Sequence, residues 1–436
     1  MNPLAEELNR TIQASAPYLL EMLSATGRRF FFPSKGILSQ SAEAKKLAHK
    51  YNATIGVALQ KGEAMYLPSV MEQLPGISPN DALLYAPSYG LMELRKAWRQ
   101  VTLHDNPDLE GKPVSLPVVT GGLSHGLSLI ADLCVDEGDL LVYPDKNWGN
   151  YALNFVQRRG AEPRLFPLFA NGGFNTDGLR QALATAFAEG RRKAIVLLNF
   201  PNNPTGYAPT EAECTDIAAA LQEIAEQGMN LVVIVDDAYY GLFFEPQVAR
   251  QSLFTKLAGL HPRILAFKAD AATKEVYVWG LRVGFVAFSI GGVPVDDPVF
   301  QAVNDKMGGL IRSVVSNCSA LSQHLVAKAL QNPNFYAERA ANVEIIRQRA
   351  AKAHEVLQNP KYAQAWEPYP FNSGYFMSVK VKQVSAADLR IHLLKKYGVG
   401  TIAINDTDLR FAFSSVELEQ IPGLYEDAYR AWQDLA

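Results

Sequence analysis

Short runs of Val, Ile and Leu recur through the middle of this 436-residue chain, and they constrain its fold more than any other feature. The runs show little alternation of apolar and polar residues, which is typical of strands buried on both faces. Amphipathic segments separate several of them, and one begins at Thr210 with Glu213 placed for a capping box. Strands that alternate with helices predict a mostly parallel, doubly wound sheet. Seven strands are expected, at residues 117–120, 140–143, 163–167, 194–199, 231–235, 263–267 and 282–288.

The pattern changes near residue 320, where a long helical stretch precedes further strand-like segments at residues 374–381 and 409–414. This order of elements is typical of a smaller α+β unit. The first sixty or so residues have no place in the large sheet. We therefore predict an α/β protein with a large domain at residues 60–320 and a small domain that combines residues 1–59 and 321–436.

Charge and cysteine content narrow the possible partners. A net charge of −3, with no cluster of Lys and Arg, does not suit a nucleic-acid partner. The three cysteines, Cys134, Cys214 and Cys318, form no CxxC pair, so we expect neither a disulfide framework nor a metal site. The N-terminus lacks a basic segment followed by an apolar core, and no window is long and apolar enough for a membrane span. We expect a cytoplasmic protein that does not bind membranes.

Four motifs stand where expected strands end, and ligands bind beyond the carboxyl ends of the strands in a doubly wound sheet. They are TGGLSHGL (120–127), WGN (148–150), NNPTG (202–206) and DDAYYG (236–241). Each has an ordinary structural reading, as a turn, a solvated loop or a cap on the core. Their chemistry decides whether they form a site.

The same motifs also suit a planar, charged ligand. Paired glycines before a helix let backbone N–H groups approach a phosphate, with His125 as a first-turn helix residue rather than a catalyst. Trp148 can stack on a planar ring. Asn203 can offer its amide, Asp236 can pair with a cationic ring nitrogen, and Tyr239 can reach a phenolic oxygen on that ring.

The segment DAATKEVYVWGLRVGF, residues 270–285, contains Lys274 and, eight positions later, Arg282 between Gly280 and Gly284. Taken alone, such a pair is usually a solvated turn lysine and a strand-edge arginine. Motifs elsewhere in the chain must therefore indicate whether Lys274 and Arg282 have a functional role.

Seven motifs in order produce a family resemblance, since YAPSYGLMELRKA (85–97) and LRFAFS (409–414) join the five above. Together they resemble the class I aminotransferases of the fold-type I pyridoxal-phosphate enzymes, most of all the aspartate and aromatic branch. The resemblance covers nearly the whole chain. It implies the fold-type I architecture, with a mostly parallel seven-stranded sheet, and pyridoxal 5'-phosphate as the cofactor.

The resemblance implies that Lys274 holds the cofactor as a Schiff base, the internal aldimine, and that Arg282 binds its phosphate. Lys268 is the nearby rival, but its spacing to the arginine is wrong. The family often has a serine three residues before the lysine, in contact with the phosphate. Ala271 stands there in this chain, and Thr273 is the candidate to compensate.

The resemblance also implies roles around the cofactor ring. Asp236 would keep the pyridinium nitrogen protonated, so that the ring acts as an electron sink. Asn203 and Tyr239 would hydrogen-bond the phenolate oxygen. Trp148 would stack on the ring, and it would contact the substrate together with Asn203. The catalytic residues implied are Lys274, Asp236 and Tyr239.

The phosphate and the substrate have their own implied contacts. The backbone N–H groups of Gly122, Leu123 and Ser124 would cradle the phosphate. Tyr85 would reach it from the other subunit, which implies a homodimer with active sites at the interface. Arg410 would clamp the substrate α-carboxylate as a bidentate fork.

Arg312, four residues before Ser316, resembles the arginine that binds a side-chain carboxylate in the partner's site in the aspartate and aromatic branch. Its other reading is a structural residue near the interface. We therefore expect transfer of an amino group from a dicarboxylic or aromatic L-amino acid to a 2-oxo acid such as 2-oxoglutarate. A C–S lyase or a β-decarboxylase on the same scaffold is the alternative. A cofactor-binding regulator of transcription would need a basic segment ahead of the domain.

Overall fold

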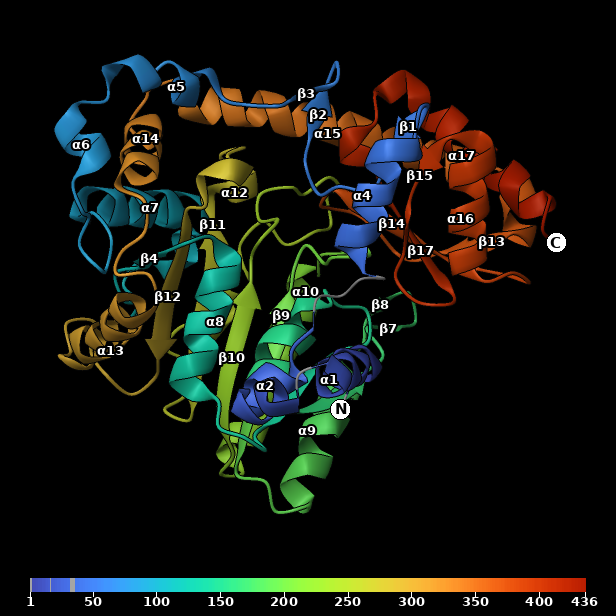
Figure 1. Cartoon of the computed structure of the whole chain (residues 1–436). Coiled ribbons are helices and arrows are strands. Elements are labelled where there is room, and N and C mark those ends of the chain that lie inside the picture. The colour runs from blue at the N-terminus through green and yellow to red at the C-terminus, as the bar shows by residue number, and fades with distance from the viewer. Residues whose placement is uncertain (1, 16, 32–35) are drawn as a thin grey trace.

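Two β-sheets organise the structure, a computed structural model that describes residues 2–15, 17–31 and 36–436 (Figure 1). All neighbouring strands of the larger sheet are parallel, except that β12 runs antiparallel to both of its neighbours. Each strand corresponds to one of the seven predicted from the sequence, so that prediction is confirmed. The order across the sheet is β4 (Val118–Thr120), β12 (Gly284–Ile290), β11 (Ile264–Ala271), β10 (Asn230–Asp236), β9 (Lys193–Asn199), β5 (Leu140–Pro144) and β6 (Glu162–Phe166).

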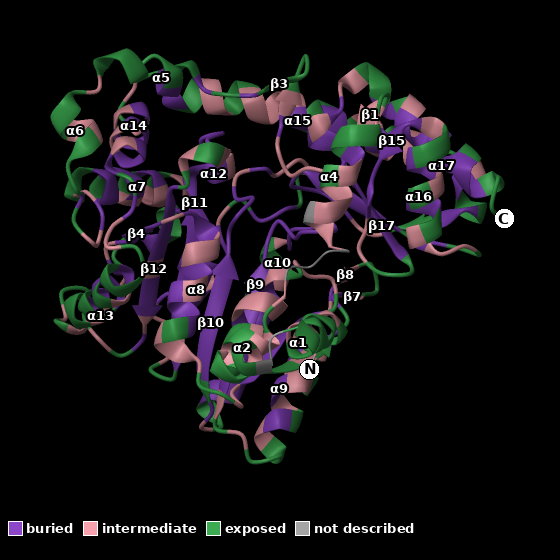
Figure 2. Cartoon of the chain, in the orientation of Figure 1, coloured by how far each residue is buried: buried purple, intermediate pink, exposed green. Residues whose placement is uncertain are grey.

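Helices cover both faces of this sheet, which explains why its strands are apolar without alternation (Figure 2). Successive side chains of a strand point to opposite faces. Along β9, Ile195 belongs to one hydrophobic core and the next residue, Val196, to the other. One core includes helices α7 (Met92–Asp105), α8 (Leu123–Cys134) and α13 (Val299–Val314), and the other includes α9 (Thr176–Ala188) and α10 (Glu211–Glu226).

The start of α10 confirms the predicted capping box. The side chain of Thr210 accepts a hydrogen bond from the backbone N–H of Glu213 at 3.2 Å. The Glu213 carboxylate accepts the N–H of Thr210 at 2.7 Å and the hydroxyl of Tyr207 at 2.7 Å. These bonds satisfy backbone donors that a helix leaves free in its first turn.

A smaller antiparallel sheet lies beyond the carboxyl ends of the large one. It contains the two strands predicted near the C-terminus, which the structure bounds as β14 (Phe376–Val381) and β17 (Asp408–Ala412). The long helix α15 (Phe335–Leu357) runs along one edge of the molecule from the large sheet to the small one (Figure 1). Other elements of this region include β13 (Trp366–Pro368), β16 (Ile402–Ala403), α16 (Ala386–Tyr397) and α17 (Ile421–Gln433).

The N-terminal region contacts both halves of the structure. Helix α4 (Ile37–Leu47) packs near β16, and β1 (Tyr51–Asn52) pairs in parallel with β15 (Val399–Gly400). Arg29, at the end of α3 (Ala25–Arg29), forms an ion pair with Glu137 beyond α8. The boundaries of the two domains stay a prediction.

Short elements complete the part of the chain that bears on the site. None of the described helices combines the length and apolar content needed to cross a bilayer. The short helix α12 (Ala272–Glu275) follows β11.

Candidate active site

A cavity of about 390 Å³ opens between the two sheets, at the carboxyl ends of β9 and β10. Most of the residues singled out in the sequence line it, although they come from six separate stretches of the chain. The predicted residues that line the cavity are Leu123, Ser124, Trp148, Asn203, Asp236, Tyr239, Lys274, Arg282 and Arg410. The lining residues that the sequence did not single out for the site include Ile37, Gly56, Tyr151, Asn199, Trp279 and Phe376.

Asp236 is the last residue of β10 and is almost fully buried. Its Oδ2 accepts a hydrogen bond of 2.6 Å from the hydroxyl of Tyr151, and its Oδ1 accepts the N–H of Ala238 at 3.0 Å. Burial raises the pKa of this carboxyl to about 6, while the two hydrogen bonds and the nearby Lys274 oppose the rise. Asp236 is therefore an anion at neutral pH that is held in one orientation.

Asn199, the last residue of β9, is hydrogen-bonded to the backbone of both Asp236 and Asn203. Its side-chain amide donates to the backbone carbonyl of Asp236 at 2.9 Å, and its carbonyl oxygen accepts the N–H of Asn203 at 2.8 Å. One side chain thus links the NNPTG turn to the end of β10. The predicted turn is real, and it also carries Asn203 into the cavity.

Lys274 follows β11 on the short helix α12, and its half-buried side chain lines the cavity. The pKa of Lys274 is lowered to about 8, chiefly by burial and also by the nearby charge of Arg282, while Asp236 opposes the decrease. The Nζ atom lies 4.4 Å from the centre of the Tyr239 ring. A larger fraction of this amine than of an ordinary lysine is therefore neutral and nucleophilic near neutral pH.

Lys268, the rival lysine, is occupied elsewhere. Its Nζ forms ion pairs with Asp237 at 2.8 Å and with Asp270 at 2.6 Å, and it does not line the cavity. The ion pairs keep Lys268 charged, and its pKa lies well above the ordinary value. A charged, doubly paired ammonium is a poor nucleophile, so the geometry favours Lys274.

A glycine and an arginine form an anion cradle at the start of α8. Gly122 has φ of +81°, and a Cβ atom built there would lie 2.4 Å from Nη2 of Arg282. Only glycine therefore lets the guanidinium approach this backbone. The N–H of Gly122 already donates to the carbonyl of Thr120 at 2.8 Å, so Leu123 and Ser124 are the better-placed amide donors.

Two neighbours of the cradle behave as the sequence suggested. His125 lies in the first turn of α8, and its Nδ1 accepts a hydrogen bond from the N–H of Gly121 at 2.9 Å. Ala271 is buried at the end of β11 and has no polar side chain, whereas Thr273 lines the cavity. Thr273 thus places a hydroxyl on the cavity wall two positions after Ala271.

Arg410 lies on β17 and reaches the cavity from the small sheet. Its Nη1 donates to Oδ1 of Asn203 at 2.9 Å, and its Nη2 donates to the carbonyl of Thr54 at 2.8 Å. Its guanidinium stacks 4.1 Å from the centre of the Phe376 ring. Burial lowers its pKa to about 10, and no acidic partner neutralises it among the described residues. The arrangement suits an anionic ligand.

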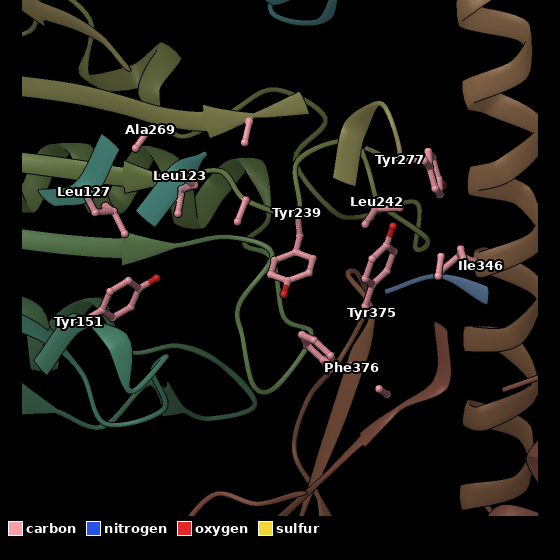
Figure 3. Packing of buried hydrophobic residues seen from close by; sticks show 14 of the residues in the cluster. Leu123, Leu127, Tyr151, Tyr239, Leu242, Ala269, Tyr277, Ile346, Tyr375 and Phe376 are labelled. Carbon is pink, nitrogen blue, oxygen red and sulfur yellow. The ribbon is translucent and has the colours of Figure 1, made fainter. Parts of the chain in front are cut away.

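Aromatic rings form the wall beside Lys274. The ring of Tyr239 meets those of Phe376 and Tyr375 edge-on, with centroids 5.4 and 5.6 Å apart (Figure 3). Burial raises the pKa of the Tyr239 phenol. Tyr239 therefore stays protonated and can donate a hydrogen bond into the cavity.

Three predicted residues do not line this chain's cavity: Gly122, whose place beside Arg282 is described above, and Tyr85 and Arg312. Tyr85 exposes 91% of its surface, and Arg312 donates to the hydroxyl of Ser316 at 2.8 Å. The two segments are neighbours, because the hydroxyl of Ser88 donates to the carbonyl of Ser316 at 2.8 Å. Both residues had been predicted to act across an interface rather than within one chain.

Tyr151 and Asn199 are the polar residues that sequence reasoning missed. Tyr151 follows Trp148 by three positions, and Asn199 ends the strand that precedes NNPTG. A polar residue close to a predicted site residue, or at the end of a buried strand, is the sequence feature that could have marked both of them. Nothing local, however, indicates that either one contacts Asp236.

A family model described as aminotransferase class I and II matches residues 48–426. A probable aspartate/prephenate aminotransferase of Aquifex aeolicus is 30% identical over 253 residues, which is 57% of each protein. The alignment thus spans little more than half the length of that relative.

Solved structures extend the likeness to the fold of the whole chain. An aminotransferase of Anaerococcus prevotii has a TM-score of 0.81 at 22% identity and covers 94% of this chain and 99% of its own. The kynurenine aminotransferase of Pyrococcus horikoshii, solved with PMP, has a TM-score of 0.79 at 15% identity and covers 96% and 98%. At these identities the likeness establishes the fold.

Proposed function

Since this chain belongs to the aminotransferase class I and II family, whose members use pyridoxal 5'-phosphate, we propose that it moves an amino group from an L-amino acid to a 2-oxo acid such as 2-oxoglutarate. One observation carries the proposal. An amine with a lowered pKa, on the half-buried Lys274, shares a cavity with a buried carboxylate, Asp236, and with an unneutralised guanidinium, Arg410.

The residues present fit the cofactor. Lys274 supplies an amine for its aldehyde, and Asp236 supplies an anion for its ring nitrogen. The Gly122 backbone and Arg282 form a cradle for its phosphate that a Cβ atom would fill. Trp148 and Tyr239 line the same cavity and are the proposed stacking and hydrogen-bonding partners of the ring.

The cofactor supplies an electron-accepting ring that stabilises negative charge at the substrate Cα. The chain's own groups do the rest. Arg410 binds the α-carboxylate, with Asn203 holding the guanidinium in place. Lys274, once its amine is free and neutral, removes the proton from Cα of the amino acid in the first half of the reaction. In the second half, which runs in reverse with the 2-oxo acid, it donates a proton to Cα. Asp236 keeps its negative charge through both halves.

The donor that we propose has a dicarboxylic or aromatic side chain. The apolar cavity walls formed by Ile37, Trp148 and Phe376 support an aromatic one. A side-chain carboxylate would need a cation, and Arg312 of a second copy is the proposed source. An enzyme with both features would accept aspartate or glutamate as well as an aromatic donor.

We propose a homodimer in which Tyr85 and Arg312 reach into the partner's site. Leu83, Leu84 and Tyr85 expose 81%, 63% and 91% of their surfaces. Val314 exposes 60%, and the Ser88 contact described above joins the two exposed segments. A large apolar patch of this kind supports an interface between proteins. A cytoplasmic location stays a prediction.

The absorption spectrum of the purified protein, recorded before and after single amino acids are added without an acceptor, tests the function. We expect a visible band from bound cofactor that converts to the spectrum of the amino form with aspartate, glutamate or phenylalanine. A band that persists while pyruvate and ammonia accumulate would identify a lyase instead. A protein that shows no band after addition of pyridoxal phosphate would contradict the role of Lys274.

A further inference from the structure

We propose that Lys146 and Asp408 form a positioning pair that joins the loop of Trp148 to the strand of Arg410 and so sets the distance between two walls of the cavity. The inference rests on the proposed function, since it assumes that these walls hold the ligand. Lys146 lies two residues before Trp148 in the loop that follows β5, and Asp408 lies two residues before Arg410 on β17.

Asp408 is the centre of the pair, and its side chain is only 1% exposed. Its Oδ2 accepts Nζ of Lys146 at 2.8 Å and Nδ2 of Asn405 at 2.9 Å. Its Oδ1 accepts the hydroxyl of Tyr369 at 2.8 Å and that of Thr407 at 3.0 Å. The carboxylate is therefore fully bonded and has one orientation.

Both the ammonium group and the backbone carbonyl of Lys146 contact neighbouring residues. Its Nζ lies 5.0 Å from the centre of the Tyr369 ring, and its side chain is 15% exposed. Its backbone carbonyl accepts Nδ2 of Asn202, in the NNPTG turn, at 3.1 Å. The ion pair lowers the pKa of Asp408 and raises that of Lys146, so both groups stay charged over the whole range in which an enzyme is assayed.

The pair completes a row of contacts from one face of the small sheet. Side chains two residues apart on a strand share a face, so Asp408 and Arg410 point the same way. Ser378, directly opposite Arg410 on β14, donates to the carbonyl of Pro204 at 2.8 Å, and Arg410 donates to Asn203. Lys146–Asp408 is the ion pair of this row. Without it, the Trp148 loop loses its direct bond to β17.

The position of the pair predicts a defect in binding rather than in chemistry. Neither residue lines the cavity, and Arg410 keeps its own bonds to Asn203 and Thr54 when the pair is broken. Loosening two walls weakens the ground state and the transition state alike, which raises KM and leaves kcat nearly unchanged.

The test measures binding of two unreactive acids, 3-phenylpropionate and succinate, to the holoenzyme by calorimetry, beside KM and kcat for phenylalanine. We expect Lys146→Met and Asp408→Asn each to weaken acid binding by about tenfold and to raise KM by a similar factor. The double variant should be no worse than either single variant, because one interaction is lost in all three. Lys146→Arg should restore binding to within about threefold of the wild type.

Lys193→Met is the matched control, since it breaks a 2.7 Å ion pair with Asp139 at the opposite end of β9 from Asn199 and should leave both acids' affinities unchanged. Circular dichroism checks that each variant folds. Affinities within about twofold of the wild type in Lys146→Met, or single effects that multiply in the double variant, would overturn the pair. A wild type that binds the acids but converts no amino acid would instead overturn the proposed function. In that case the acid affinities of the variants would still test the positioning role of Lys146 and Asp408.

Discussion

The hydroxyl of Tyr151 donates a 2.6 Å hydrogen bond to Oδ2 of Asp236, and each residue exposes only 1% of its surface. The two lie 85 residues apart in the chain. Burial alone would push the pKa of Asp236 upward, toward the neutral acid. Tyr151 opposes that shift and so helps to keep Asp236 charged where a cationic ring nitrogen would need it.

Tyr151→Phe removes the hydrogen bond that stabilises the charged form of Asp236, so the pKa of Asp236 should rise above its present value of about 6. A larger fraction is then protonated at neutral pH. We expect the apo protein's affinity for pyridoxal phosphate to fall about three- to tenfold at pH 7 and to recover as the pH rises. Tyr143→Phe is the control, because its ring lies 6.5 Å from that of Tyr151 and its hydroxyl is not bonded to Asp236. A deficit of the same size at every pH would point to packing instead.

The capture of pyridoxal phosphate by the apo protein should depend on pH through Lys274. Burial lowers the pKa of its amine to about 8, so the amine is protonated and unreactive below that pH and neutral above it. The capture rate, followed by visible absorption, should rise between about pH 7 and about pH 9 and be half-maximal near the pKa. Lys274→Arg should show no covalent capture. A midpoint near the pKa of a free lysine would refute the assignment.

Lys268→Met should destabilise the protein without abolishing cofactor capture. It leaves Asp237 and Asp270 buried without their cation, at a cost of about 3–5 kcal/mol in the free energy of unfolding. Lys193→Met, which breaks a partly exposed ion pair, should cost no more than about 1 kcal/mol. Urea unfolding measures both values. A Lys268→Met protein that folds but fails to capture the cofactor would revive the rival lysine.

Gly122→Ala and Gly138→Ala separate backbone strain from the phosphate cradle. Both glycines have positive φ, +81° and +85°, so each substitution should cost about 1–3 kcal/mol of stability. Only the Cβ at position 122 would meet another group, Nη2 of Arg282 at 2.4 Å. Pyridoxal-phosphate affinity, measured by fluorescence titration, should therefore fall in Gly122→Ala and be unchanged in Gly138→Ala. Equal losses would show that the cradle is not at Gly122.

Arg312→Ala tests the proposed dicarboxylate donor. We expect kcat/KM for aspartate and glutamate to fall about 100-fold, while that for phenylalanine changes by less than about threefold. Lys306→Ala, an exposed cation on the same helix α13, is the control. Aspartate kinetics that do not change in Arg312→Ala would leave the aromatic donor as the remaining choice.

Much of the fold could be predicted because its signals are local. Consecutive apolar residues such as Ile195 and Val196 indicate a strand with two buried faces, and Thr210 with Glu213 indicates the start of a helix. The antiparallel direction of β12 could not be predicted this way, since its apolar pattern matches that of the parallel strands. The direction of a strand depends on the path of the segment that connects it to the preceding strand, and this path is a feature of the tertiary structure.

The sequence by itself determined the strands and the turns at their carboxyl ends, and its family resemblance predicted Lys274 and Arg282, because burial periodicity, turn chemistry and motif spacing are properties of short stretches. Only the tertiary structure decided which side chains meet. Tyr151 and Asp236 are 85 residues apart, and Lys146 and Asp408 are 262 residues apart. Tertiary packing likewise set the charge states of Lys268 and Lys274, two lysines six positions apart on one segment. One is surrounded by carboxylates and stays charged, while the other is buried beside Arg282 and loses its proton more readily. Desolvation and charge pairing depend on neighbours in space, so no reading of the local sequence contains them.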